Sequence, residues 1–227
     1  MTYKTETHLH TAESSFCASI YALDMLHAYK EEGYSTIIIT DHYLEHYFKH
    51  VSDNWSERLD YLMNGYKEAL KHAKELGINV LFGIELKLRQ TSTDYLIYGI
   101  TEEFLRNNLN LYKLSLEELI DICNKNNYLI VNTHPFRKGM ELIPLEYKVP
   151  IEIYNGNSLQ MKNNRNHLAE GYALKHNLIG ISGSDFHNFN DLANGGIVTN
   201  YEINSIEDFI NCVKNNDFKN IINKQVK

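Results

Sequence analysis

The chain has 227 residues, of which 43% are hydrophobic and 22% are charged, proportions typical of a protein that folds around its own core. Its formal net charge of −7 disfavours nucleic-acid binding, which usually depends on a basic face, but it is compatible with a local basic pocket for a phosphorylated substrate. No window approaches the roughly 18 uninterrupted apolar residues of a membrane span, and the polar start of the chain predicts no signal peptide.

The chain contains three cysteines, Cys17, Cys123 and Cys212, which are far apart and form no C-x-x-C pair. An odd number of scattered cysteines argues against a disulfide framework and indicates free thiols in a reducing compartment. We therefore expect a cytoplasmic protein that has no membrane partner.

Short apolar runs rich in β-branched residues alternate along the chain with longer amphipathic segments. The short runs predict strands at residues 4–9, 35–40, 78–86, 94–100, 128–133, 150–155 and 178–183, with a less clearly marked run at 195–200. The amphipathic segments predict helices at about residues 18–32, 56–76, 115–126, 163–176 and 205–214. Ser115 is a suitable N-cap, while Gly33 and Gly77 stand where helical patterns stop.

This alternation of strands and helices predicts parallel βαβ units, and seven or eight strands suit either a barrel or an open sheet. No low-complexity linker, Pro/Gly-rich hinge or block of like charge interrupts the sequence. We therefore expect residues 1–227 to form a single α/β domain. The segments 43–56 and 137–148 are predicted to be loops that supply the walls of a pocket.

Imidazoles and carboxylates gather at the carboxyl ends of the predicted strands. The first strand carries His8 and His10 at alternate positions, which puts both on one face. Later strands supply His42, Glu85, His134, Asp185 and His187. The carboxyl ends of parallel strands meet at one edge, where α/β barrels and sheets build their active sites. This mixture of ligand types suits two or three divalent Mn, Zn or Fe ions, and paired ions suit the hydrolysis of phosphate esters.

The ordered set "HLH", "TDH", "GIE", "THP" and "SGSDFH" resembles the four motifs of the PHP (polymerase and histidinol phosphatase) family. The resemblance covers nearly the whole chain, from His8 to His187. It implies a distorted seven-stranded, TIM-like β/α barrel that holds two or three Mn, Zn or Fe ions and has phosphoesterase activity. The chain resembles the compact stand-alone members of the family rather than the polymerase-attached ones.

The resemblance also implies a set of metal ligands: His8, His10, His42, Glu85, His134, Asp185 and His187, with Glu85 bridging two ions. Two positions depart from the family pattern. Ser15 stands where many members have an Asp or His that binds a third ion, and Glu13 is the candidate substitute. Asp94 stands in for a histidine that often follows the bridging glutamate. If both acids substitute, the centre holds three ions, and if neither does, it is dinuclear.

Three further residues near the motifs have less specific interpretations. Arg137 and Arg165 are candidate phosphate contacts, because a guanidinium group matches the geometry of phosphate, although ordinary surface arginines are equally compatible with the sequence. Cys17 lies close to the first motif, but the sequence specifies no base to activate it, so we interpret it as a packing residue or a bystander.

The predicted reaction is hydrolysis of a small phosphorylated substrate, either a phosphomonoester or a phosphodiester. Bound ions would lower the pKa of a bridging water so that hydroxide attacks phosphorus in line. Glu85, Asp185 and His187 are the predicted catalytic residues, with Asp185 or His187 handling the proton.

The sequence leaves two other functions open. A nucleic-acid phosphodiesterase resembling a 3′–5′ exonuclease is disfavoured by the acidic charge and by the lack of an interleaved basic and aromatic stripe. A non-catalytic metal-binding regulatory domain is disfavoured because every motif histidine and both core acids are present.

Overall fold

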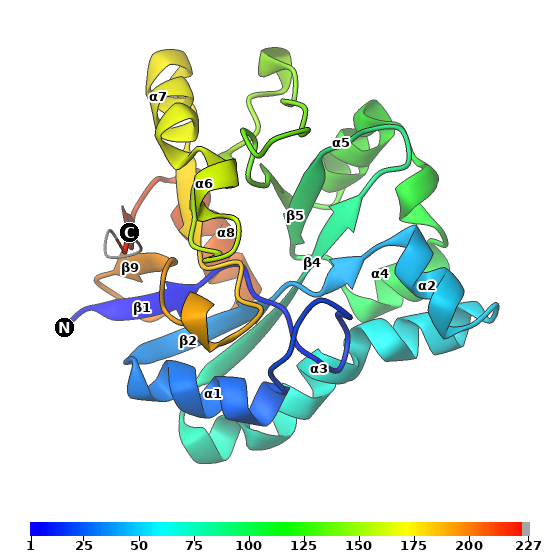
Figure 1. The fold of residues 1–227 in the computed structure, drawn as a ribbon, viewed down its shortest axis with the longest axis horizontal. Helices are drawn as coiled ribbons and strands as arrows, with labels where there is room; N and C mark the ends of the chain where they lie inside the picture. Colours follow the sequence, from blue (N-terminus) through cyan, green and yellow to red (C-terminus); the bar gives the residue numbers. More distant parts are fainter. Residues whose placement is uncertain (224–227) are drawn as a thin grey trace.

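A mixed sheet that curls into a nearly closed barrel organises the molecule (Figure 1). The computed structural model describes residues 1–223. The strands are β1 (Tyr3–Glu6), β2 (Tyr34–Ile39), β3 (His42–Tyr43), β4 (Asn79–Lys87), β5 (Asp94–Tyr98), β6 (Leu129–Asn132), β7 (Ile151–Asn155), β8 (Gly180–Gly183), β9 (Ile197–Thr199) and β10 (Lys219–Asn220). Their order is β10-β9-β1-β2-β4-β5-β6-β7-β8, and β3 pairs with β4.

A parallel bridge between Leu9 and Phe186 joins the segments that follow β1 and β8. In this bridge the backbone N–H of His10 donates to the carbonyl oxygen of Phe186 over 3.0 Å. The bridge closes the barrel at the end where the histidine motifs lie. The α/β class and the barrel architecture expected from the sequence are therefore confirmed, and every described strand belongs to one sheet.

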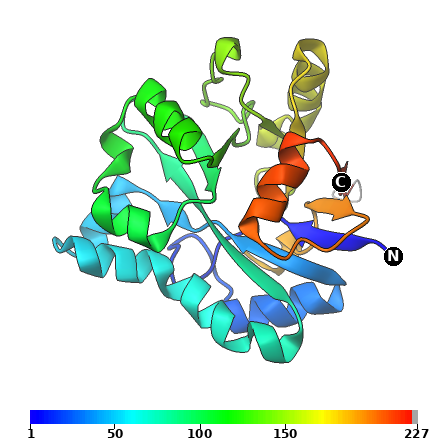
Figure 2. The ribbon, with the colours of Figure 1, turned by 180° about the vertical axis from the view of Figure 1, so that it is seen from behind.

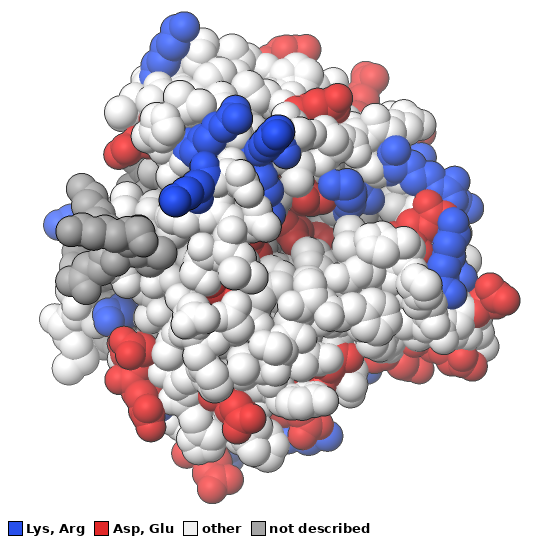
Figure 3. Space-filling model, viewed as in Figure 1, with Lys and Arg blue, Asp and Glu red and all other residues white. Residues whose placement is uncertain are grey.

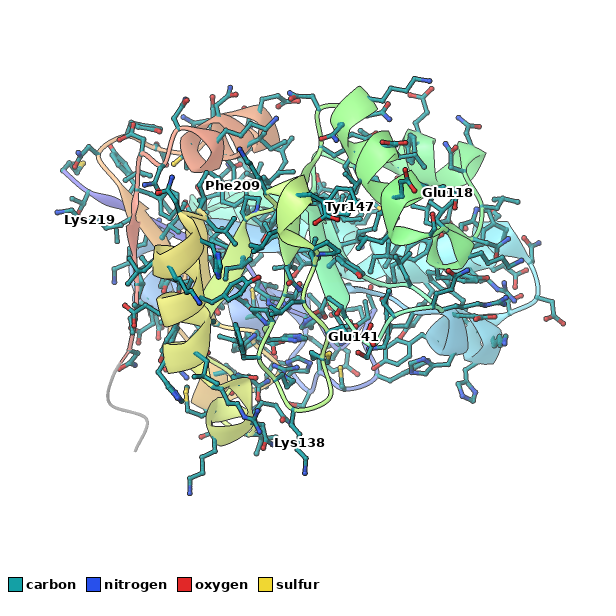
Figure 4. All side chains as sticks on the ribbon, turned by 90° about the horizontal axis from the view of Figure 1, so that it is seen from above. Glu118, Lys138, Glu141, Tyr147, Phe209 and Lys219 are labelled. Carbon is teal, nitrogen blue, oxygen red and sulfur yellow. The ribbon has the colours of Figure 1, made fainter. Side chains whose placement is uncertain are left out.

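Helices surround the barrel. They are α1 (Ala22–Glu31), α2 (Glu45–Val51), α3 (Trp55–Leu76), α4 (Glu102–Asn107), α5 (Leu116–Lys125), α6 (Met161–Asn164), α7 (Asn166–His176) and α8 (Ile206–Lys214). Helix α8 lies across the back of the molecule, away from the histidine motifs (Figure 2). Its Phe209 is completely buried, with its ring centroid 4.7 Å from that of Tyr98 (Figure 4). No helix within residues 1–223 combines the length and apolar character needed to cross a membrane.

Local sequence signals explain several helix boundaries. Ser115 and Ser205 each form a complete capping box, in which the side chain accepts a backbone N–H and an acid three residues on accepts in return. Gly77 ends α3 in the left-handed conformation, with φ of 60°, which glycine adopts without steric cost. Helix α1 begins at Ala22, later than expected, and the Glu13 carboxylate accepts the N–H of Ala22 at this start.

The structure corrects three expectations about individual elements. The sheet is not entirely parallel, since β5 runs antiparallel to β4 and β6, and β9 runs antiparallel to β1. Only residues 88–93 separate β4 from β5, too few for the crossover that a parallel pair needs. The segment 43–56, expected to be a loop, contains α2, and the expected helix 163–176 is divided at Arg165, where φ is 52°.

Candidate metal centre

The predicted ligands meet at the edge of the barrel where β1, β4, β6 and β8 end. They surround a cavity of about 520 Å³ whose lining includes His42, Glu85, Asp94, His134, Asp185 and His187. The space-filling view shows this hollow with acidic side chains at its floor and basic side chains around its rim (Figure 3). His8 and His10 are completely buried behind the lining. The site therefore combines an acidic interior with a basic entrance.

The first cluster consists of His8, His10 and Asp185. The Nε2 atoms of His8 and His10 lie 3.2 Å apart, and each is 3.3–3.4 Å from Oδ1 of Asp185. The Glu85 carboxylate adds its two oxygens at 3.5 Å from His8 Nε2 and 3.4 Å from His10 Nε2. Ligand atoms held tetrahedrally at about 2.0–2.1 Å from a zinc ion lie about 3.3 Å from one another. The spacing in the first cluster therefore fits a divalent ion.

The second cluster consists of Glu85, Asp94 and His134. His134 Nε2 lies 3.1 Å from Oε1 of Glu85 and 3.7 Å from Oδ2 of Asp94. Asp94 reaches this edge because β5 runs antiparallel to β4. Asp94, the first residue of β5, therefore pairs with Lys87 at the end of β4. Lys87 Nζ donates to Oδ1 of Asp94 over 3.0 Å and leaves the other oxygen facing the cluster.

The third cluster consists of His10, His42 and His187. The His10 ring lies between the other two, with centroid distances of 4.1 Å to His42 and 4.5 Å to His187. His42 Nδ1 is 2.8 Å from Oε2 of Glu85, but without the geometry of a hydrogen bond. The Nδ1 atoms of His10 and His42 are buried and have no hydrogen-bond partner among the described residues. A buried polar atom without a partner, such as His10 Nδ1, calls for a ligand, so this cluster also fits an ion.

Charges within the site are closely coupled. Burial alone would lower the pKa of His8, but the carboxylates of Asp185, Glu152 and Glu85 hold it well above its ordinary value. Desolvation would raise the pKa values of Glu85 and Asp185, yet surrounding imidazoles, His8 foremost, hold both well below the ordinary range. The two carboxylates are therefore ionised and able to bind cations.

Glu152, the second residue of β7, holds two of the histidines in place, a role that we did not predict from the sequence. Its Oε1 is 2.8 Å from His8 Nδ1, while its Oε2 accepts the backbone N–H of His134 over 2.8 Å. With the His8 proton on Nδ1, the lone pair of Nε2 points into the first cluster. A buried acid inside the apolar run "PIEIYN" was the sequence signal for this role.

The backbone is strained at two of the candidate ligands. His134 has φ of 30° and Asp185 has φ of 49°, a region that side chains other than glycine seldom occupy. Strain of this kind costs on the order of 1–3 kcal/mol per residue and persists where surrounding contacts hold it. At Asp185 one such contact is Arg137, whose Nη2 donates to Oδ2 over 2.8 Å.

The loop after β1 arranges its polar side chains differently from the family pattern. The Glu13 carboxylate accepts the Ala22 N–H over 2.9 Å and joins none of the three clusters. Ser15 Oγ donates to Oδ1 of Asp41 over 2.7 Å. Neither residue therefore faces the third cluster.

Cys17, on the same loop, lines the cavity, and its Sγ lies 3.1 Å from Nε2 of His187. Burial raises the pKa of this thiol, but hydrogen bonds to His187 and His42 lower it to about 5. The sequence specified no base beside Cys17. The structure places one there, His187, which lies 170 residues further along the chain.

The two arginines proposed for phosphate binding occupy different environments. Arg137 lines the cavity, and besides Asp185 it contacts Asn164 through an Nε–H···Oδ1 hydrogen bond of 2.6 Å. Arg165 is exposed at the junction of α6 and α7 and is not among the described residues that line the cavity. The geometry thus favours Arg137 as a contact for a ligand in the cavity.

Sequence comparison identifies one family. The sequence model of the PHP domain matches residues 6–218. No curated protein matches the chain.

Several solved structures share the fold. PsfC from Pseudomonas syringae has a TM-score of 0.72 and 17% identity, over 99% of this chain and 93% of its own. A two-domain Bacteroides vulgatus protein containing a predicted PHP-like metal-dependent phosphoesterase has a TM-score of 0.69 and 17% identity, over 98% of this chain. The chain spans 65% of that protein. The lesion-specific endonuclease PfuEndoQ from Pyrococcus furiosus has a TM-score of 0.63 and 16% identity, over 95% of this chain and 56% of its own.

Proposed function

The chain belongs to the PHP domain family, and from this membership and the geometry of the site we propose that it hydrolyses a small phosphorylated substrate as a metal-dependent phosphoesterase. Glu85 is the observation that carries the proposal. Its Oε1 lies 3.1 Å from His134 Nε2, and its Oε2 lies 3.4 Å from His10 Nε2. A carboxylate shared between neighbouring clusters suits a pair of ions a few ångströms apart, the arrangement that phosphoryl-transfer enzymes use.

The proposed ligands divide between two adjacent ions. His8, His10 and Asp185 would hold one, Asp94 and His134 the other, and Glu85 would bridge them. The mixture of imidazole and carboxylate suits Mn, Zn or Fe. When bound, paired ions of this kind activate water near neutral pH and neutralise charge on the phosphoryl oxygens.

The chain's own groups would position the reacting molecules. The ionised Asp185 directs Oδ1 toward the first cluster, while its other oxygen accepts from Arg137. Asp185 would therefore orient a water molecule by accepting its hydrogen bond rather than by donating a proton. Arg137 lies on the cavity wall, where its remaining N–H groups would bind a phosphate oxygen. His187 would hold the proton for the leaving group in a centre of two ions, but would be a ligand in a centre of three.

The cavity supports a small substrate. Its volume of about 520 Å³ falls within the usual range for small-molecule sites. Asn157, Gln160 and Asn188 on its wall offer neutral hydrogen-bonding groups for the rest of the molecule.

A nucleic-acid phosphodiester is the second candidate substrate. Phe16 is 57% exposed, and its ring centroid lies 4.8 Å from that of Tyr47, which lines the cavity. An exposed aromatic ring such as that of Phe16 can stack on a base. The PfuEndoQ structure, described as a lesion-specific endonuclease, shares the fold. The net charge of −7 counts against this candidate.

Metal analysis and hydrolysis assays on the same sample test the proposal. We expect two or three Mn, Fe or Zn ions per chain. We also expect turnover of p-nitrophenyl phosphate or bis-p-nitrophenyl phosphate. A single-stranded oligonucleotide is assayed as a third substrate, to test the nucleic-acid candidate. His10→Ala and Asp185→Asn should lose metal and turnover together. His27→Ala, which changes an exposed histidine on α1, is the matched control and should retain both. A protein that stays inactive on every substrate after Mn or Zn is added would instead favour a non-catalytic metal-binding domain.

A further inference from the structure

The loop that carries Cys17 is anchored beside the third cluster. Its Ser19 N–H donates to the His187 carbonyl oxygen over 2.9 Å, and its Ser15 Oγ donates to Asp41. One bond connects the loop to the segment that supplies His187, and the other connects it to the segment that supplies His42. Cys17 Sγ, 3.1 Å from His187 Nε2, is therefore held at the cluster by its surroundings.

The third cluster independently requires a ligand. His10 is completely buried, and its Nδ1 has no hydrogen-bond partner among residues 1–223. Nδ1 of His42 also lacks a hydrogen bond among these residues, but it lies 2.8 Å from Oε2 of Glu85. Three imidazoles whose donor atoms lie within 4.8 Å of one another would repel if protonated, whereas a cation between them would satisfy their lone pairs.

The loop offers no carboxylate to complete this cluster. Glu13, its only acid between residues 11 and 21, accepts the N–H of Ala22 at the start of α1. Ser15, at the position where the family pattern has an acid or a histidine, donates to Asp41. Of the ligand types on this loop, the thiol of Cys17 is the one that reaches the cluster.

We propose that Cys17 binds, as a thiolate, an ion held by His42 and His187 beside His10, so that the third metal position is a nitrogen–sulfur site. The inference rests on the proposed metal centre but not on its hydrolytic activity. A thiolate at about 2.3 Å and an imidazole at about 2.0–2.1 Å from one tetrahedral ion stand roughly 3.5 Å apart. The Sγ···Nε2 distance of 3.1 Å needs only a small adjustment to reach this spacing.

The donor set predicts which ion occupies the third position. Thiolate is a soft ligand that favours Zn or Fe, whereas sites rich in carboxylate accept Mn or Mg readily. The second cluster contributes two carboxylates and one imidazole, and the third contributes imidazoles and the thiolate of Cys17. We therefore expect a thiophilic divalent ion at the third position, even when the other positions hold Mn.

Cobalt spectroscopy tests the ligand directly. Co²⁺ is added to the metal-free full-length chain, up to three equivalents per chain, and its absorption is recorded. Thiolate ligation should give a strong near-ultraviolet sulfur-to-cobalt charge-transfer band in the unaltered protein. Cys17→Ser should lose this band but keep the weaker visible bands of cobalt bound to nitrogen and oxygen. Unaltered protein without the band, or a variant that keeps it, would overturn the proposal.

Alkylation provides a second measurement on the unaltered chain. Cys17 is exposed, whereas Cys123 and Cys212 are buried and serve as internal controls. Zn²⁺ should slow the reaction of Cys17 with iodoacetamide by about tenfold or more, because a coordinated thiolate is a poorer nucleophile. An unchanged rate at Cys17 would contradict thiolate ligation. Neither readout depends on turnover, so failure of the phosphoesterase proposal and failure of this one give different results.

Discussion

At the scale of single residues, Glu152 affects the metal centre through the histidines that it contacts. Its two oxygens bond to His8 Nδ1 and to the backbone N–H of His134, one residue from each of two clusters. A carboxylate behind a ligating histidine sets the tautomer, the ring orientation and the basicity of the ligand. Glu152 is buried, with 1% exposure, which shields its two oxygens from water.

Glu152→Gln should therefore weaken metal binding about 10–100-fold, the usual effect of removing such a partner. Competition with a chromophoric zinc chelator measures the affinity. Glu170→Gln, on the exposed face of α7, is the matched control and should bind metal like the unaltered chain. Equal affinities in the two variants would show that Glu152 has no influence on the ligands.

Asp94 is expected to serve one ion only. It belongs to the second cluster, and its Oδ2 lies 3.7 Å from His134 Nε2. Asp94→Asn removes the charge but keeps the shape, so the metal content should fall by about one ion per chain while the first cluster stays loaded. Elemental analysis after gel filtration measures the content. An unchanged metal content would remove Asp94 from the ligand set.

The two arginines form a matched pair for testing substrate binding. Arg137 lines the cavity, whereas Arg165 is exposed outside its lining. Losing one charge-assisted hydrogen bond to phosphate costs about 1.5–3 kcal/mol, so Arg137→Ala should raise KM about tenfold or more. Arg165→Ala should leave KM unchanged. Steady-state kinetics, with metal content checked in each variant, distinguish the two. A higher KM in the Arg165 variant would reverse the assignment.

At the scale of elements, α3 packs against the loop that carries the first ligands. A Cβ atom added at Gly65 would lie 1.9 Å from Oγ1 of Thr11 and 3.0 Å from Oδ2 of Asp41. Thr11 donates to both oxygens of Asp41, the residue before His42. The absence of a side chain at Gly65 thus allows the helix to approach a hydrogen-bond network next to the metal centre.

Gly65→Ala should lower the free energy of unfolding by about 1–3 kcal/mol, because the added methyl group forces α3 or the loop to shift. Urea unfolding measures the change. Gly171→Ala is the matched control: its added Cβ meets no atom within 4 Å, so a gain of roughly 0.5–1 kcal/mol from helix propensity is expected. A Gly65 variant as stable as the control would show that the packing relaxes without cost.

At the scale of the whole molecule, the metal centre connects distant parts of the chain. The clusters join residues near β1, such as His8, to residues after β8, such as Asp185. The Leu9–Phe186 bridge closes the barrel at the same place. An ion bound there would stabilise the closed sheet relative to the unfolded chain, because the ligands assemble only on folding.

Removing the metal should therefore lower the melting temperature of the entire protein. At a free metal concentration of 100 times Kd, binding at one site stabilises the fold by about 2.7 kcal/mol. Calorimetry with and without a chelator measures the difference. His10→Ala, which removes a residue common to two clusters, should show a much smaller response to the chelator. A chelator that leaves the melting temperature of the unaltered chain unchanged would argue against a structural contribution from the ions.

The sequence by itself determined the local structure and the chemical types in the site. Alternating apolar runs predicted β2, β4 and β8, and capping signals at Ser115 and Gly77 predicted helix ends. These features depend on residues a few positions apart, so they can be recognised without the fold. The order of the histidine and acid motifs along the chain also indicated the family, which the family model confirms.

Only the tertiary structure decided which groups meet. It brought Asp94 to the ligand edge by reversing β5, and it turned Glu13 toward the N-terminus of α1. It also placed Cys17 beside His187 and Glu152 behind His8. These contacts join residues from 9 to 170 positions apart. Barrel closure and strand register set such distances, and no local pattern records them, because both depend on how the whole chain packs.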